Sequence, residues 1–175
     1  VCSAQNLSLQ SNSRDAVVSG LVLNFVPKPG DAIAEMMRVS KPGGKIGAFV
    51  WDYAEGMQFL RYFWDAAIAV DPDAAAYDEG SRFPVCQNGQ LARMFQVAGI
   101  QQIVVKAIEI KTEFKNFDDY WQPFLGNVGA APNYINRLGI NKIQKLESIL
   151  RNILPTNQNG SISLLAKAWA VKGIV

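Results

Sequence analysis

The sequence predicts an α/β fold in which parallel strands alternate with helices and an antiparallel pair of strands follows. Three observations carry this prediction. Residues 15–51 read as strand, loop, helix, turn and strand. Several later segments have apolar residues at helical spacing, and residues 100–112 alternate apolar with charged side chains. We expect one domain over residues 1–175, with helices on both faces of the sheet.

The first strand is expected at Asp15–Ser19, where a Val-Val centre is typical of a buried parallel strand. Residues 20–25 stay apolar and are expected to form a loop at the strand end. A helix is predicted over 31–39 from its apolar spacing. Pro42-Gly43-Gly44 should end that helix and turn the chain. The next strand, 46–51, is apolar on both faces.

Two further helices are predicted by apolar spacing, over 59–70 and over 90–98, the second ended by Gly99. The strand at 100–112 alternates apolar and charged residues, which indicates one wet face and so an antiparallel or edge strand. The remaining stretches are expected to be an irregular segment over 74–86, a short helix over 117–125 begun by Asn116, a mostly helical stretch over 134–154, a turn at 157–160 and a last strand over 161–171.

The composition is that of a globular protein, with 49% hydrophobic and 18% charged residues and a formal charge of +2. The basic residues are spread along the chain, so a nucleic-acid partner is not expected. No apolar run approaches the ~20 residues of a membrane span, so none is expected. Cys2 and Cys86 lack a CxxC spacing and are expected to be reduced thiols in a cytoplasmic protein. The absence of histidine excludes histidine-based nucleophilic triads and histidine-ligated zinc, and we expect no metal site.

Five segments together resemble the class I S-adenosylmethionine-dependent methyltransferases, specifically the type 11 group related to the ubiquinone and menaquinone biosynthesis enzymes. Cys2–Leu7 is similar to that family's Gly-Asp-Ala-Gln-x-Leu segment, and Arg14–Ser19 to the Phe-Asp-x-Val-x-Ser of its fourth strand. Pro42–Gly44, Leu91–Ile100 and Gly160–Gly173 resemble the turn before the fifth strand, the helix before the sixth and the last strand. The resemblance implies S-adenosyl-L-methionine as cofactor and a small-molecule methyl acceptor.

The chain departs from the family pattern at its N-terminal side. The acidic residue and Gly-x-Gly loop that follow the family's first strand have no counterpart here, and the sequence begins near the end of the third strand. Ser3 stands where the family has an aspartate on the adenine amino group, Ser8 replaces a proline, and Arg14 replaces a phenylalanine. The resemblance therefore implies the C-terminal half of a Rossmann-like sheet, with methyl transfer expected in the complete protein. The alternative is a truncated, non-catalytic module that oligomerises.

The resemblance also implies cofactor-binding positions. The adenine would lie against Ser3, Ala4 and Gln5, which could equally be an ordinary polar loop. The methionine part would contact the backbone of Ser19, Gly20 and Leu21, since ligands of open α/β sheets bind outside the carboxyl ends of the strands. The alternative for this segment is the plain end of a buried strand.

Five residues are candidates for binding the methyl acceptor: Asn24, Trp51, Tyr53, Arg82 and Trp121. Each has a structural alternative, namely a turn cap for Asn24, core packing for the aromatic residues and a solvated loop position for Arg82. Asp52 could be a general base or a helix N-cap. Asp118 and Asp119 are better read as acidic residues at a helix N-terminus than as a metal site. No residue is identified as catalytic.

A strand at 15–22 without its partner on one side would leave an exposed apolar edge, which is a template for pairing with another strand. We therefore expect a homodimer, or a complex with a separately encoded N-terminal half.

Overall fold

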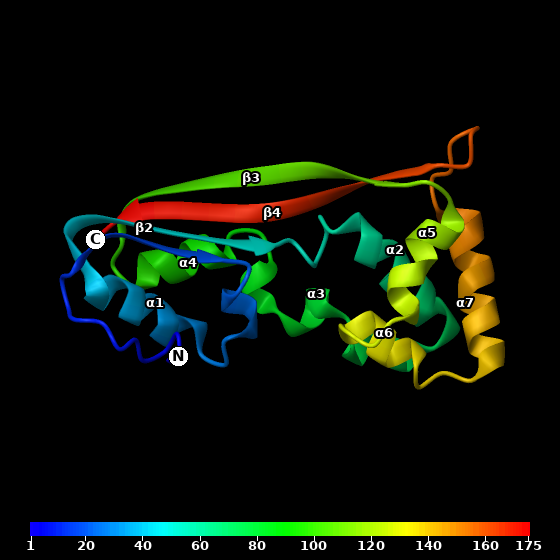
Figure 1. Ribbon diagram of the computed structural model, residues 1–175, viewed down its shortest axis with the longest axis horizontal. Helices are drawn as coiled ribbons and strands as arrows, with labels where there is room; N and C mark the ends of the chain where they lie inside the picture. Colours follow the sequence, from blue (N-terminus) through cyan, green and yellow to red (C-terminus); the bar gives the residue numbers. More distant parts are fainter. The chain divides into compact units, whose positions relative to one another are not determined.

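Four strands form one sheet in the order β1-β2-β4-β3 in the computed structural model, which describes all residues 1–175 (Figure 1). β1 (Arg14–Gly20) runs parallel to β2 (Ser40–Trp51), and β2 pairs antiparallel with β4 (Ile162–Ile174). β3 (Gln101–Phe114) lies at the far edge. The predicted α/β fold, with parallel strands followed by antiparallel pairing, is confirmed, as is the edge position of the strand predicted over 100–112.

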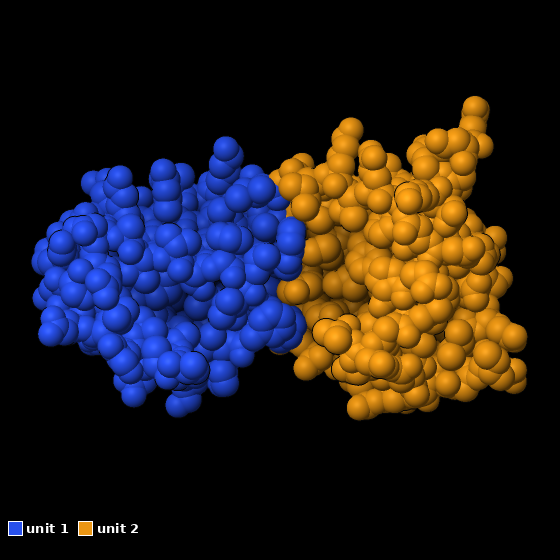
Figure 2. Space-filling model, viewed as in Figure 1, with its two compact units in different colours: residues 1–52, 83–108, 168–175 blue, residues 53–82, 109–167 orange.

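The chain divides into two compact units (Figure 2). The first comprises residues 1–52, 83–108 and 168–175, and the second comprises residues 53–82 and 109–167. Residues 1–175 were expected to form one domain, and the division into two compact units leaves that expectation a prediction. No helix in either unit has the length and apolar character needed to cross a membrane.

The first unit packs two helices on one face of the strands (Figure 1). α1 (Pro29–Val39) begins with a proline in its first turn, where the missing N–H costs no hydrogen bond. Its side chains Ile33 and Val39 are fully buried, as are Ile46 and Val50 on alternate positions of β2. α4 (Gln90–Val97) packs against α1, and two short 3₁₀ turns, η1 (Leu23–Phe25) and η3 (Pro84–Cys86), complete the layer.

The turn predicted at Pro42-Gly43-Gly44 is present, although the strand assignment of β2 already begins at Ser40. Gly43 has a φ of +76°, a conformation that glycine adopts without a steric penalty. A Cβ on Gly44 would lie 2.7 Å from the carbonyl oxygen of Lys41. Glycine at both positions is therefore required by the tightness of the turn.

β1 differs from the buried strand that its Val-Val centre predicts. It is the terminal strand of the sheet, and 70% of Val18 is exposed. Val18 is paired with Gly47 and Gly20 with Phe49, on the sheet face opposite to Ile46 and Val50. The burial predicted from the Val-Val centre was wrong, whereas the exposed edge expected for this strand without a partner on one side is present.

The second unit is mostly helical around an aromatic core. Phe63 and Trp64 pack edge-to-face at 4.9 Å, and Phe124 stacks on Phe63 at 4.5 Å, all nearly inaccessible to solvent. Aromatic pairs at these separations contribute beyond the area they bury. The elements of this unit are α2 (Gln58–Val70), η2 (Pro72–Ala76), α3 (Glu79–Arg82), α5 (Phe117–Trp121), η4 (Gln122–Leu125), α6 (Ala130–Ile135) and α7 (Ile140–Ile153).

Two expectations need correction here. The helical stretch predicted over 134–154 is two helices, because the chain leaves α6 after Ile135 and begins α7 after Gly139. The alternation in β3 predicts one buried face, yet Val104 and Val105, which point to opposite faces, are 50% and 44% exposed. β3 has valines on both faces, and its apolar and charged residues alternate only where charged residues separate the apolar ones. The pattern therefore does not show that one face of the strand is buried.

Candidate functional site

The carboxyl ends of β1 and β2 meet at one edge of the first unit, since the two strands are parallel and Gly20 is paired with Phe49. Leu21 leaves this edge with a φ of +54°, and its N–H donates to the Phe49 carbonyl oxygen at 2.8 Å. A Cβ on Gly20 would lie 2.6 Å from the Phe49 ring. Glycine here is therefore required by the aromatic ring that lies across it, which is a packing reason independent of any ligand.

Asn24 lies in η1, beyond the end of β1, and only 8% of it is exposed. Its amide nitrogen Nδ2 is buried without a hydrogen-bond partner. A buried donor without an acceptor is rare in folded proteins and costs about 1–3 kcal/mol. The N-cap residue of η1 is Val22, so Asn24 does not cap the start of that turn, and a role of Asn24 in binding stays a prediction.

A buried carboxylate stands at the end of β2. Asp52 is 1% exposed, and its Oδ2 accepts a hydrogen bond from Trp169 Nε1 at 3.1 Å. The helix that follows has Met57 at its N-cap position, so the alternative reading of Asp52 as that N-cap was wrong. Trp51, the predicted acceptor-binding residue beside it, is half-buried on the opposite sheet face from Val50.

The thiol of Cys86 is fully buried in the same unit. Burial and, secondarily, the negative charge of Asp52 raise the pKa of this thiol to about 12. A thiol with so high a pKa is almost entirely protonated near neutral pH, and it is a poor nucleophile. Cys86 is therefore a packing residue, in line with the expectation of a reduced thiol.

The predicted adenine-binding residues lie on a tight turn at the start of the chain. The N–H of Asn6 donates to the carbonyl oxygen of Ser3 at 3.0 Å, and the N–H of Gln5 donates to Ser3 Oγ at 3.2 Å. The Gln5 side chain reaches Asp31 of α1 at 3.4 Å. Hydrogen bonds within the protein therefore order this turn, and Ser3 and Gln5 have polar atoms at its surface.

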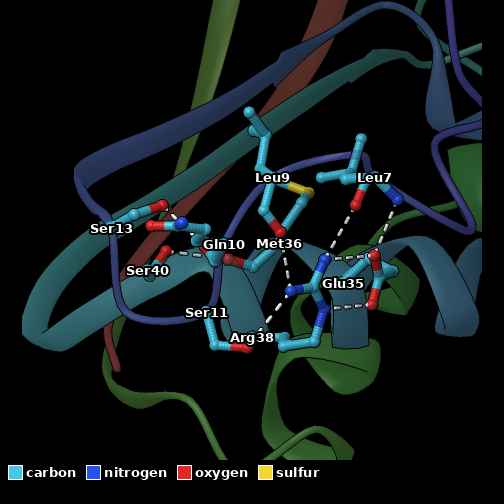
Figure 3. A network of polar contacts seen from close by, with 9 residues as sticks. All are labelled: Leu7, Leu9, Gln10, Ser11, Ser13, Glu35, Met36, Arg38 and Ser40. Carbon is cyan, nitrogen blue, oxygen red and sulfur yellow. Dashed lines mark hydrogen bonds and ion pairs between the residues drawn. The ribbon is translucent and has the colours of Figure 1, made fainter.

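A clamp formed by Glu35 and Arg38 of α1 fixes the segment that carries this turn (Figure 3). The Leu7 N–H donates to Glu35 Oε2 at 2.7 Å. The Arg38 guanidinium donates to the carbonyl oxygens of Leu7 and Leu9, each at 2.9 Å, and to Ser11 Oγ at 3.2 Å.

The two clamp residues also bind one another, with Arg38 Nε 2.6 Å from Glu35 Oε1 and Nη2 2.8 Å from Oε2. Hydrogen bonds from Arg38, and then from the Leu7 N–H, lower the pKa of Glu35 to about 2. Sequence reasoning missed the clamp. The only signal was an acid and a base three residues apart on a predicted helix, a spacing that places them side by side.

Three of the predicted acceptor-binding residues, Tyr53, Arg82 and Trp121, belong to the second unit. The Tyr53 carbonyl oxygen accepts from Arg61 Nη1 at 3.0 Å. Trp121 is 6% exposed and packs against Phe124 with ring centroids 5.8 Å apart, which supports its structural alternative of core packing. Arg82 is exposed at the end of α3. Roles in binding for these three stay predictions.

The short helix α3 is fixed to α2 by two buried acids that sequence reasoning missed. Asp78 accepts both guanidinium nitrogens of Arg61, at 3.0 and 2.7 Å, and Glu79 accepts a hydrogen bond from Trp64 Nε1. Burial raises the pKa of Glu79. A Cβ on Gly80 would lie 2.9 Å from the Tyr53 carbonyl oxygen, so glycine allows this close approach. The segment predicted to be irregular is thus ordered by polar contacts, which apolar spacing cannot reveal.

The chain is similar to known methyltransferases in both sequence and fold. Residues 1–48 match the family model described as a methyltransferase domain. A proposed methyltransferase from Bacillus halodurans C-125 is 14% identical, with a TM-score of 0.54 over 99% of this chain and 69% of that one. The YcgJ protein of Bacillus subtilis is 17% identical, with a TM-score of 0.53 over 99% of this chain and 68% of that one.

A further structure, a protein from Anabaena variabilis ATCC 29413 assigned to an antibiotic biosynthesis pathway, is 16% identical, with a TM-score of 0.50 over 95% of this chain and 70% of that one. No curated protein matches the chain. At these identities the structural likeness establishes the fold, and the sequence match covers residues 1–48. The chain has a Rossmann-like fold similar to that of the methyltransferase structure from Bacillus halodurans, and its residues 1–48 match the methyltransferase domain family.

Proposed function

We propose that the protein, in its complete form, transfers a methyl group from S-adenosyl-L-methionine to a small-molecule acceptor, in the cytoplasm. The observation that carries this proposal is the match of residues 1–48 to a methyltransferase domain, within a chain that has the methyltransferase fold. Those residues include the N-terminal turn, the carboxyl end of β1 and the clamp of α1. The match therefore falls on the edge of the sheet where ligands of open α/β sheets bind.

The residues at this edge fit one side of a nucleoside-type cofactor. Ser3 and Gln5 offer a hydroxyl and a side-chain amide on an ordered turn. The backbone of Ser19, Gly20 and Leu21 lies at the strand end, where the amino acid part would bind. S-adenosyl-L-methionine supplies an electrophilic methyl group when bound. In this proposal the Gly-x-Gly loop that would hold its other side is provided by an N-terminal half outside residues 1–175.

The buried donor of Asn24 and the buried carboxylate of Asp52 support a polar contact to the methyl acceptor. Asn24 Nδ2 would donate to an oxygen of the acceptor and so orient it. Methyl transfer is a direct displacement that depends on alignment and on a dry site more than on a set of acids and bases. The absence of histidine is compatible with this chemistry, and the half-buried Trp51 favours an apolar or aromatic acceptor.

A second candidate function is favoured by the exposed edge of β1. Leu21 directs its N–H to β2, so the alternate residues Ala16, Val18 and Gly20 direct their backbone groups to the free edge. With 70% of Val18 exposed, this edge is a template for another strand. In this alternative the chain is a non-catalytic module whose β1 pairs with a second copy. In the methyltransferase reading, β1 pairs with the N-terminal half.

Hydrogen exchange with and without S-adenosylhomocysteine tests the proposed cofactor site. We expect slower exchange at the amides of residues 3–7 and 19–21 when the ligand is present, both for the chain alone at high ligand concentration and, more strongly, with its N-terminal half. If the β1 amides exchange more slowly as the protein concentration rises, and the ligand has no effect on this, the result would favour the oligomerising module. Binding without any change at residues 3–7 or 19–21 would refute the assignment of the site.

A further inference from the structure

We propose that a cavity in the second unit binds an oxyanion group, either a carboxylate or a phosphate. The cavity has a volume of about 350 Å³. Its polar lining is provided by Tyr77, Arg82, Asn133 and Arg137, and the rest of the wall consists of alanine side chains. The lining thus includes two guanidinium groups, a phenol and a primary amide, all of which carry hydrogen-bond donors, and it includes no carboxylate.

Arg137 is held in place for this role by Tyr77. Its Nη1 donates to the Tyr77 hydroxyl at 2.7 Å, and its guanidinium carbon lies 5.2 Å from the centre of the same ring. No aspartate or glutamate lies within ion-pair distance of Arg137. One of its five N–H donors is therefore used within the protein, and the planar fork stays available for a bidentate oxyanion.

Three acids close in sequence to the cavity have partners of their own. Asp71 pairs with Lys142 at 2.8 Å, and that hydrogen bond lowers the pKa of Asp71. Asp78 is held by Arg61, and Glu79 accepts from Trp64. None of these three carboxylates is among the residues that line the cavity. The lining contains two arginines and no acid, although the unit that contains it has more acids than bases.

The position of Arg82 is set by the same buried contacts, because Arg82 ends the helix that Asp78 and Glu79 fix to α2. The cavity therefore has one arginine on an anchored helix and another braced against a tyrosine. Charge-assisted bonds from arginine to carboxylate or phosphate are shorter and roughly twice as strong as neutral ones. The arrangement favours a ligand with a planar or tetrahedral oxyanion at one end.

The proposed anion site lies wholly within the second unit and makes no assumption about the methyl acceptor or the cofactor. Anion binding itself depends only on residues of the second unit. It can therefore be measured without the cofactor, and it can fail or succeed independently of methyl transfer.

The test is an NMR titration of the ¹⁵N-labelled chain with inorganic phosphate at constant ionic strength, repeated with benzoate. We expect saturable shifts at residues 76–82 and 130–137 with a millimolar dissociation constant. Arg137→Gln should weaken binding about tenfold, equivalent to about 1.4 kcal/mol. Arg151→Gln is the matched control, because it removes the same charge from the same unit at a residue paired with Glu147 at 2.7 Å.

Saturation by either anion with loss in Arg137→Gln alone supports the site, and the stronger of the two anions identifies the chemical class. Equal weakening by both variants would show a general charge effect and overturn the proposal, as would shifts that never saturate. Tyr77→Phe keeps the ring under Arg137 and removes the hydroxyl, and it should weaken binding less than Arg137→Gln.

Discussion

Replacement of Arg61 by methionine should be among the most destabilising single changes in the second unit. The side chains of Arg61 and Asp78 are 14% and 9% exposed, and two nitrogen–oxygen contacts of 3.0 and 2.7 Å join them. Methionine keeps much of the side-chain volume but leaves the Asp78 carboxylate buried with only the Gly80 N–H, at 2.8 Å, as a partner. Removing one partner of a buried ion pair costs about 3–5 kcal/mol, mainly because the remaining charge is uncompensated.

Urea unfolding followed by tryptophan fluorescence measures this cost. We expect Arg61→Met to lower the free energy of unfolding by about 3–5 kcal/mol. In thermal unfolding, a domain of this size loses roughly 2–4 °C per kcal/mol. The double variant Arg61→Met/Asp78→Asn removes both charges and should be less destabilised than the two single changes added together. A loss below about 1 kcal/mol in Arg61→Met would place the pair in the range of surface ion pairs and refute the reasoning.

Three further predictions concern the first unit. The Glu35 carboxylate has its pKa lowered to about 2, so its bond to the Leu7 N–H persists above the ordinary pKa of 4.5 and is lost as pH falls toward 2. The protection factor of the Leu7 amide, its exchange rate compared with that of an unstructured peptide at the same pH, should fall over that window in the native chain and be low at all pH values in Glu35→Gln. Cys86, buried and with a pKa of about 12, should be inert to a thiol reagent at pH 8 while exposed Cys2 reacts, and two fast thiols per chain would contradict the packing described. Gly173→Ala should cost about 1–3 kcal/mol in urea unfolding, because its Cβ would lie 2.8 Å from the Gln101 carbonyl oxygen; an unchanged midpoint would contradict that contact.

Much of the fold followed from periodicity. The helices predicted over 31–39, 59–70 and 90–98 begin and end within two residues of α1, α2 and α4, because each combines strong apolar spacing with a proline or glycine boundary. Asn116 caps α5 through its side chain, which accepts from the Asp119 N–H at 2.9 Å. Asp118 and Asp119 lie in the first turn of α5, and Asp119 Oδ2 accepts from the Lys115 N–H at 2.9 Å, so the interpretation of them as acidic residues at a helix N-terminus is confirmed.

Burial was harder to predict than secondary structure. Val18 and Val104 have the side chains of buried strands, but they are exposed because β1 and β3 lie at the edges of the sheet. Whether a strand has neighbours on both sides depends on the rest of the sheet, and local composition contains no information about it.

The candidate site was predictable only where backbone topology determines it. The carboxyl ends of β1 and β2 lie at one edge because parallel strands require it. The clamp of Glu35 and Arg38, the buried pair of Arg61 and Asp78 and the unpaired amide of Asn24 depend on side-chain geometry. The bond from Arg38 to Leu7 and the pair of Arg61 and Asp78 join residues 31 and 17 positions apart, and no pattern in the sequence marks these two contacts.

The most direct test of the central claim, that this chain has a methyltransferase cofactor site, is calorimetric titration of the chain with S-adenosylhomocysteine, alone and with its N-terminal half. We expect one-site binding in the completed protein and at least tenfold weaker binding by the chain alone. Absence of binding in the completed protein would contradict the claim. Equal affinity with and without the N-terminal half would contradict the view that the Gly-x-Gly loop is required.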